Sequence, residues 1–141
     1  MAERRFPFSM RPLLSGAVPW LAWIALIFGL SAQSQPALSP YTSFLAFPHA
    51  DKLLHFSEYA VLGALTLRML ALFRPSERRW PFPTLADALV MCAAIACLDE
   101  LSQRLSPGRS PDVADVLADC IGAAAGALAW RCLSQRILPR R

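Results

Sequence analysis

The chain has 141 residues, of which 55% are hydrophobic and only 17% are charged, and its formal net charge is +4. An ordinary soluble domain carries about a quarter charged residues, so this composition favours a membrane protein instead. The basic residues form short clumps between apolar runs. That pattern is typical of membrane-topology signals and argues against a nucleic-acid-binding surface, so no nucleic-acid partner is expected.

The first apolar segment runs from Leu13 to Leu30 and has no charged residue over 18 positions. At about 1.5 Å per residue it can cross a hydrocarbon core of roughly 30 Å, and we predict a span at about 12–31. The preceding arginines also fit a signal peptide. However, the apolar run is long for one, and SAQSQP offers no small-x-small cleavage site, so we expect the segment to be retained.

Three further spans are predicted, at about 52–73, 84–103 and 111–132. The third ends in the polar extension DELSQRL, and the fourth opens at SPD, with Ser110 as the expected N-cap and Pro111 as the first helical residue. No repeat or long linker divides the chain. We therefore predict an all-α, four-helix transmembrane bundle that forms a single domain over residues 1–141.

The four cysteines lie in apolar helical stretches without CxxC or metal-ligand spacing. We interpret them as packed thiols. The sequence therefore predicts no disulfide, no cofactor and no metal bound through cysteine. These cysteines are Cys92, Cys97, Cys120 and Cys132.

Loop charges predict the orientation. Ten arginines lie before the first span, between the second and third, and after the fourth, whereas the other two loops hold Lys52, Arg104 and Arg109. This asymmetry predicts that both termini are cytoplasmic in a multi-pass protein of the bacterial inner membrane. The ends of spans one and three and the starts of spans two and four would then meet at the outer face.

The motif DKLLHFSEY begins the second span. Asp51, His55 and Tyr59 are spaced by four and share one helix face, where Asp51 could orient the His55 ring. The alternative is a capped helix entrance, with Asp51 and Lys52 in the first turn and Tyr59 at the membrane interface.

The motif DELSQ ends the third span and brings Asp99, Glu100 and Gln103 to the same membrane depth. A solvated helix end, in which Glu100 pairs with Arg104, is the simple interpretation. Adjacent carboxylates at the end of an apolar helix are costly, however, and therefore favour a binding role.

The fourth span carries three carboxylates and two glycines at steps of 3, 4, 3 and 4, so they lie on one helix face: Asp112, Asp115, Asp119, Gly122 and Gly126. The glycines allow close approach of another helix. Asp112 fits the first helical turn. Asp119 lies deeper, where a carboxylate costs roughly 2.5–3.5 kcal/mol unless it is neutral, paired or hydrated.

These motifs, in this order, resemble the VanZ-like family of small bacterial membrane proteins, and the similarity covers nearly the whole chain. The resemblance implies a four-span membrane fold and a link to teicoplanin-type glycopeptide resistance. The position of Asp119 is more often Asn in that family. The family pattern carries over to Asp51, Lys52, His55, Tyr59, Asp99, Glu100, Gln103, Arg109, Asp115, Gly122 and Gly126.

Two classes of function fit an outer-facing polar pocket built from these residues and Asp119. In the first, a non-catalytic protein binds a lipid headgroup or a lipid-linked cell-wall precursor, with Lys52, Arg109 and His55 holding a phosphate or carboxylate. In the second, an intramembrane hydrolase or transferase uses His55 as general acid or base. The sequence leaves the choice, and the oligomeric state, open. We expect His55, Arg109 and Asp115 to lie close enough to share one bound anion or water.

Two weaker alternatives remain. A magnesium or calcium ion could be held by four carboxylates, although their spacing alone leads us to predict no metal. A transporter is disfavoured because the inner halves of the spans lack polar residues. The four carboxylates are those of Asp99, Glu100, Asp115 and Asp119.

Overall fold

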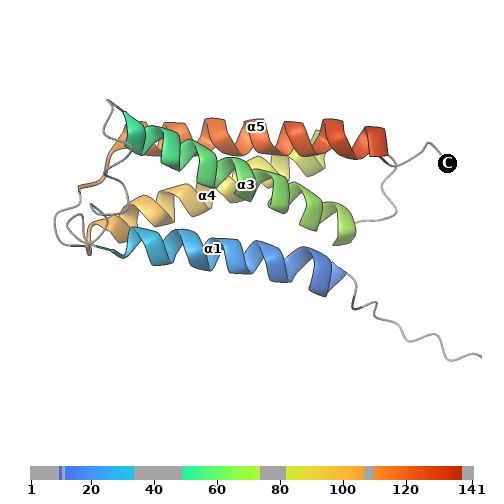
Figure 1. Ribbon diagram of the computed structural model, residues 1–141, viewed down its shortest axis with the longest axis horizontal. Helices are drawn as coiled ribbons and strands as arrows, with labels where there is room; N and C mark the ends of the chain where they lie inside the picture. The colour runs from blue at the N-terminus through green and yellow to red at the C-terminus, as the bar shows by residue number, and fades with distance from the viewer. Residues whose placement is uncertain (1–9, 11, 34–48, 74–81, 107–109, 138–141) are drawn as a thin grey trace, which may run out of the picture.

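The computed structural model describes residues 10, 12–33, 49–73, 82–106 and 110–137. All regular secondary structure in these ranges is helical, which confirms the predicted all-α, four-helix fold (Figure 1). The elements are η1 (Leu13–Ala17), α1 (Val18–Ser31), α3 (Ala50–Phe73), α4 (Phe82–Gln103) and α5 (Val113–Ile137).

The first helix opens with a π-helical turn, η1, that continues directly into α1. Pro19 lies near the start of α1 and has no N–H to donate to the preceding turn, where its ring would also crowd a carbonyl. A wider π turn just before a proline accommodates both effects. The segment therefore remains one helical rod that is long enough to cross a membrane.

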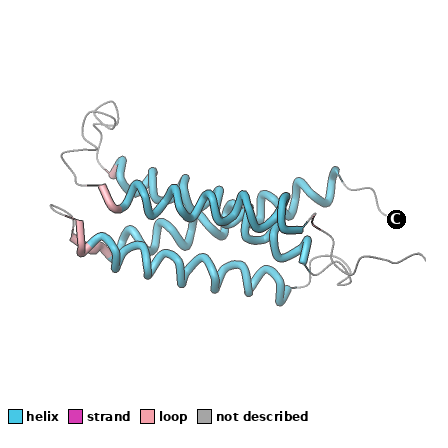
Figure 2. The backbone as a smooth tube through the Cα atoms, turned by 90° about the horizontal axis from the view of Figure 1, so that it is seen from below, coloured by secondary structure: helices cyan, strands magenta, loops and turns pink. Residues whose placement is uncertain are grey.

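Successive helices run in opposite directions (Figure 1), and they lie alongside one another in the turned view as well (Figure 2). The C-terminal ends of α1 and α4 and the N-terminal ends of α3 and α5 therefore meet at the same end of the bundle, on the left in Figure 1. At this end, the Ser106 hydroxyl, beyond α4, donates a hydrogen bond to the Ser31 carbonyl at 3.1 Å. The polar motifs DKLLHFSEY, DELSQ and SPD are brought together as a result.

Helices α3 and α5 form the most extensive contact in the bundle. Their backbones touch because glycines occupy the crossing: a Cβ on Gly122 would overlap the Phe56 carbonyl, and one on Gly126 would overlap the Ala60 carbonyl. In the same way, a Cβ on Gly63 of α3 would overlap the Ala123 carbonyl of α5. This approach is closer than side chains would allow, and it brings the acidic face of α5 directly onto α3.

The bundle interior combines apolar packing with a few satisfied polar groups. Tyr59, Leu62 and Ile27 are fully buried in one core cluster. The Trp23 indole N–H of α1 donates to the Glu58 carbonyl at 2.9 Å, and the Trp20 indole N–H donates to the Thr66 hydroxyl at 2.8 Å. These bonds attach α1 to α3 and fix the helix on which the polar residues lie.

Three of the helical segments are long and apolar enough to cross a membrane: Leu13–Ser31, Ala50–Phe73 and Val113–Arg136. Helix α4 has a comparable length of 22 residues but carries three acidic residues. Large apolar side chains are exposed on every helix, including Leu21 on α1, Val61 on α3, Val90 on α4 and Ile121 on α5. Such a surface is suited to lipid, and the chain is therefore a multi-pass membrane protein.

The start of the last helix differs from the prediction. Helix α5 begins at Val113, and the N-cap is Asp112, whose carboxylate accepts the Ala114 N–H at 2.9 Å. Ser110 and Pro111 precede the helix, so the predicted cap at Ser110 was wrong. The helix also continues to Ile137 instead of ending near Cys132, because no glycine or proline interrupts it there.

Candidate functional site

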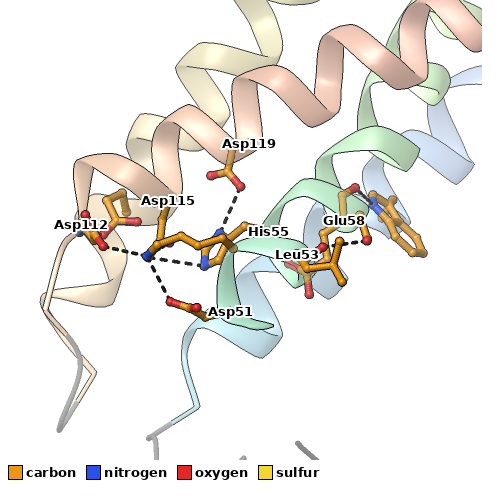
Figure 3. A network of polar contacts seen from close by, with 11 residues as sticks. Asp51, Leu53, His55, Glu58, Asp112, Asp115 and Asp119 are labelled. Atoms are coloured by element: carbon orange, nitrogen blue, oxygen red, sulfur yellow. Dashed lines mark hydrogen bonds and ion pairs between the residues drawn. The ribbon is translucent and has the colours of Figure 1, made fainter. Parts of the chain in front are cut away.

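Polar side chains from α3 and α5 converge at the end of the bundle where DKLLHFSEY begins (Figure 3). Asp99 and Glu100 of α4 join them there. We call this group the polar cluster. Arg109, also predicted to belong to the site, lies outside the described residues. The polar cluster consists of Asp51, Lys52, His55, Tyr59, Asp99, Glu100, Gln103, Asp112, Asp115 and Asp119.

Lys52 organises the outer rim of the cluster. Its ammonium group donates to Asp115 at 2.6 Å, to Asp112 at 2.7 Å and to Asp51 at 3.1 Å. An ammonium group has three N–H donors, and all three are used here. Lys52 therefore has no donor left for an external phosphate in this arrangement, and it serves to hold the start of α5 against α3.

Asp112 also belongs to this rim, although it was not among the site residues predicted from the sequence. It caps α5 and receives the Lys52 ammonium, which lowers the pKa of the Asp112 carboxyl below its usual value. Its position in SPD, immediately before an apolar run, was the available signal, but it indicated a helix start and not a site.

His55 lies one turn further along α3, between two carboxylates of α5. Its Nδ1 is 3.0 Å from Asp119 Oδ1, and its Nε2 is 3.8 Å from Asp115 Oδ2. Asp51, which by its spacing could have oriented this ring, contacts Lys52 instead, and its side chain is 61% exposed. The ring is thus oriented by the neighbouring helix and not by its own, because α3 and α5 approach so closely.

Helix α4 closes the cluster from the third side. Glu100 accepts the backbone N–H of Asp112 through Oε1, and this bond ties the end of α4 to the start of α5. Asp99, Glu100 and Gln103 are 1%, 6% and 3% exposed. The solvated helix end considered from the sequence is therefore wrong for these three side chains.

The deepest part of the cluster contains polar atoms without hydrogen bonds. The hydroxyl of Tyr59 and Oδ2 of Asp119 have no hydrogen-bond partner among the residues that the structure describes, although both residues are fully buried. Asp99 and Asp119 both lie within electrostatic reach of the Tyr59 hydroxyl. Buried polar atoms normally find partners, so these atoms point to a bound group or ordered water.

The described cluster is strongly acidic. Its six carboxylates face one lysine and one histidine, which suits ammonium groups, hydroxyls or metal ions better than free anions. The four carboxylates considered for magnesium or calcium do not form one site. Glu100 accepts the Asp112 N–H, and Asp115 accepts the Lys52 ammonium group. Donor atoms of His55, Asp99 and Asp119 instead lie within 4.8 Å of one another.

The structure thus brings the predicted site residues of α3 and α5 together with Asp99 and Glu100 of α4, whereas Gln103 is buried on α4 at the same end of the bundle. His55 and Asp115 are adjacent, as the shared-site hypothesis required, whereas its third member, Arg109, is not among the described residues. Gly122 and Gly126 lie one and two turns beyond Asp119, at the contact with α3.

Comparison with known proteins identifies a family for this chain. The family model described as VanZ/LLP1 matches residues 8–134, which is most of the chain and includes the whole polar cluster. No curated protein and no solved structure matches the chain.

Proposed function

Because the chain belongs to the VanZ/LLP1 family, we propose that this multi-pass protein binds a lipid headgroup or a lipid-linked precursor of the cell envelope through its polar cluster. The membrane is proposed to be the bacterial inner membrane. The loop arginines support an orientation with cytoplasmic termini, in which the polar cluster would lie at the outer face.

One observation carries the proposal: buried carboxylates from two helices meet at the end of a bundle whose outer surface is apolar. Asp99, Asp115 and Asp119 are at most 8% exposed. Carboxylates at such a depth are costly unless they have partners, and the headgroup layer of the membrane lies at the same height as a bundle end. A ligand with its own lipid tail would reach the cluster along the helices.

The charge of the cluster defines the class of headgroup. Lys52 is already engaged by three carboxylates, so the remaining chemistry favours an ammonium group or sugar hydroxyls. An outer-face site for such a molecule would lie where teicoplanin-type glycopeptides act on peptidoglycan precursors. Lower susceptibility to these drugs is therefore part of the proposal.

A lipid-dependent thermal shift tests this function. The full-length protein in detergent is heated with phosphatidylethanolamine, which carries an ammonium group, or with phosphatidylglycerol, which does not. The proposal predicts a higher melting temperature with phosphatidylethanolamine, by mass action on the folded state, and loss of the difference in Asp119→Asn. Equal shifts for both lipids in the wild type would contradict an acidic headgroup site.

A second function, an intramembrane hydrolase or transferase, is favoured by one contact. The 3.0 Å separation of His55 Nδ1 and Asp119 Oδ1 resembles the arrangement in which a carboxylate orients a general base. Incubation with a lipid-linked diphosphate and mass spectrometry of the products tests this alternative. Product that forms with the wild type and not with His55→Gln would favour catalysis, and an unchanged substrate would favour binding alone.

A further inference from the structure

We propose that His55, Asp99 and Asp119 form a binding site for a divalent transition-metal ion such as Zn²⁺. One donor atom from each residue lies within 4.8 Å of the other two. Each residue comes from a different helix, so a bound ion would join α3, α4 and α5 at one point. The inference goes beyond the proposed lipid binding and does not depend on it.

The distances come close to those of a metal site. Zinc binds imidazole nitrogen at about 2.0–2.1 Å and carboxylate oxygen at about 2.0–2.2 Å, so two ligand atoms on one ion lie at most about 4.4 Å apart. Side-chain adjustments of about half an ångström would bring the present set within that limit. Side-chain rotations of that size require no movement of the helices.

A second observation, independent of the clustering, points to a ligand. Asp119 has a side chain that is only 1% exposed, and its Oδ2 has no hydrogen-bond partner among the described residues. The hydroxyl of Tyr59, fully buried nearby, is in the same situation. A cation at this point would coordinate Asp119 Oδ2, which accepts no hydrogen bond from the described residues.

The surroundings of His55 resemble those of metal-bound histidines, although the carboxylate next to its second ring nitrogen lies beyond hydrogen-bond distance. When Nδ1 binds the ion, its proton is released and the remaining N–H lies on Nε2, which faces Asp115 at 3.8 Å. Asp115 is itself held by Lys52 at 2.6 Å. Metal-bound histidines commonly donate their second N–H to a carboxylate of this kind, which fixes the ring orientation.

The donor set also indicates the type of ion. An imidazole nitrogen favours zinc and its transition-metal neighbours over magnesium and calcium, which prefer oxygen ligands alone. Three protein ligands would leave at least one coordination position for water or an oxygen-bearing ligand. The site therefore differs from the four-carboxylate arrangement considered from the sequence.

Metal titration of the full-length, tag-free protein in detergent, after treatment with a chelator, tests the inference. We expect one Zn²⁺ per chain by elemental analysis and binding much tighter than that of Mg²⁺. His55→Gln and Asp119→Asn should each weaken Zn²⁺ binding at least tenfold, which is the lower limit seen even for residues outside the ligand set. Asp87→Asn provides a matched control, since Asp87 lies on α4 twelve residues before Asp99.

Two further measurements keep the test decisive. Helical circular dichroism and size-exclusion elution identify any variant that fails to fold, and Asp115→Asn, which removes no ligand, should still weaken binding about 10- to 100-fold. Absence of saturable Zn²⁺ binding by the wild type, or wild-type affinity in all folded variants, would overturn the inference. The titration contains no lipid, so metal binding and lipid binding can fail separately.

Discussion

At the level of single residues, Lys52 determines the shape of the rim because one ammonium group meets carboxylates of both α3 and α5. The three contacts are not equivalent. The Asp51 and Asp112 side chains are 61% and 48% exposed and gain little from a partner, whereas that of Asp115 is 11% exposed. The Lys52–Asp115 pair is therefore the contact on which stability depends.

Lys52→Met tests this pair. Leaving the Asp115 carboxylate buried without the ammonium group should lower the free energy of unfolding by roughly 1–3 kcal/mol, measured by denaturation in detergent. The Lys52→Met/Asp115→Asn double variant should recover part of this loss, because the unpaired charge is gone. Strictly additive effects of the two substitutions would show that the pair contributes nothing of its own.

The sequence predicted which polar residues share a helix face and a membrane depth. It did not predict which of them form pairs. Asp51, His55 and Tyr59 do follow one face of α3. Yet His55 bonds to Asp119, sixty-four residues away, because a long-range helix contact decides which carboxylate reaches the ring. Spacing along one helix contains no information on that choice.

At the level of secondary-structure elements, the contact between α3 and α5 positions the cluster. Gly122 and Gly126 permit it from α5, and the sequence spacing indicated their role. Gly63 completes the contact from α3, but a single glycine in an apolar helix has no periodic signal, so it was missed. The backbone-to-backbone approach explains why His55 and Asp119 come within bonding distance.

Gly126→Ala tests this contact with the smallest possible change. The added methyl group would overlap the backbone carbonyl of Ala60, which cannot rotate away, so we expect a loss of at least about 2 kcal/mol in unfolding free energy. Gly29→Ala is the matched control, since a Cβ there meets nothing within 4 Å. Similar melting temperatures for the two variants would contradict the close packing.

At the level of the whole molecule, the antiparallel order of the helices gathers the motifs DKLLHFSEY, DELSQ and SPD at one end (Figure 1). The membrane-spanning segments and their order were predictable from the sequence, because a membrane span requires a long apolar run. The start of α5 was less predictable, because Ser110 and Asp112 are both residue types that cap helices and the sequence does not say which of them does so. Which membrane face the polar end occupies stays a prediction from the loop arginines.

Single-cysteine labelling tests that orientation, in a background with the four native cysteines replaced. Leu105→Cys is a suitable probe because Leu105 is 87% exposed at the polar end, and Gln135→Cys reports on the opposite end of α5. We expect a membrane-impermeant thiol reagent to label Leu105→Cys in intact cells and Gln135→Cys only after permeabilisation. The reverse pattern would place the polar cluster in the cytoplasm.

Native mass spectrometry of the gently extracted protein tests most directly whether the polar cluster is a binding site. We expect the wild type and Asp87→Asn to retain a bound molecule of lipid mass. His55→Gln, Asp119→Asn and the double variant should all lose it to the same extent, because the two side chains hold the molecule as one unit. A wild-type spectrum showing only the bare chain, or equal retention in all variants, would contradict binding of a lipid by the polar cluster.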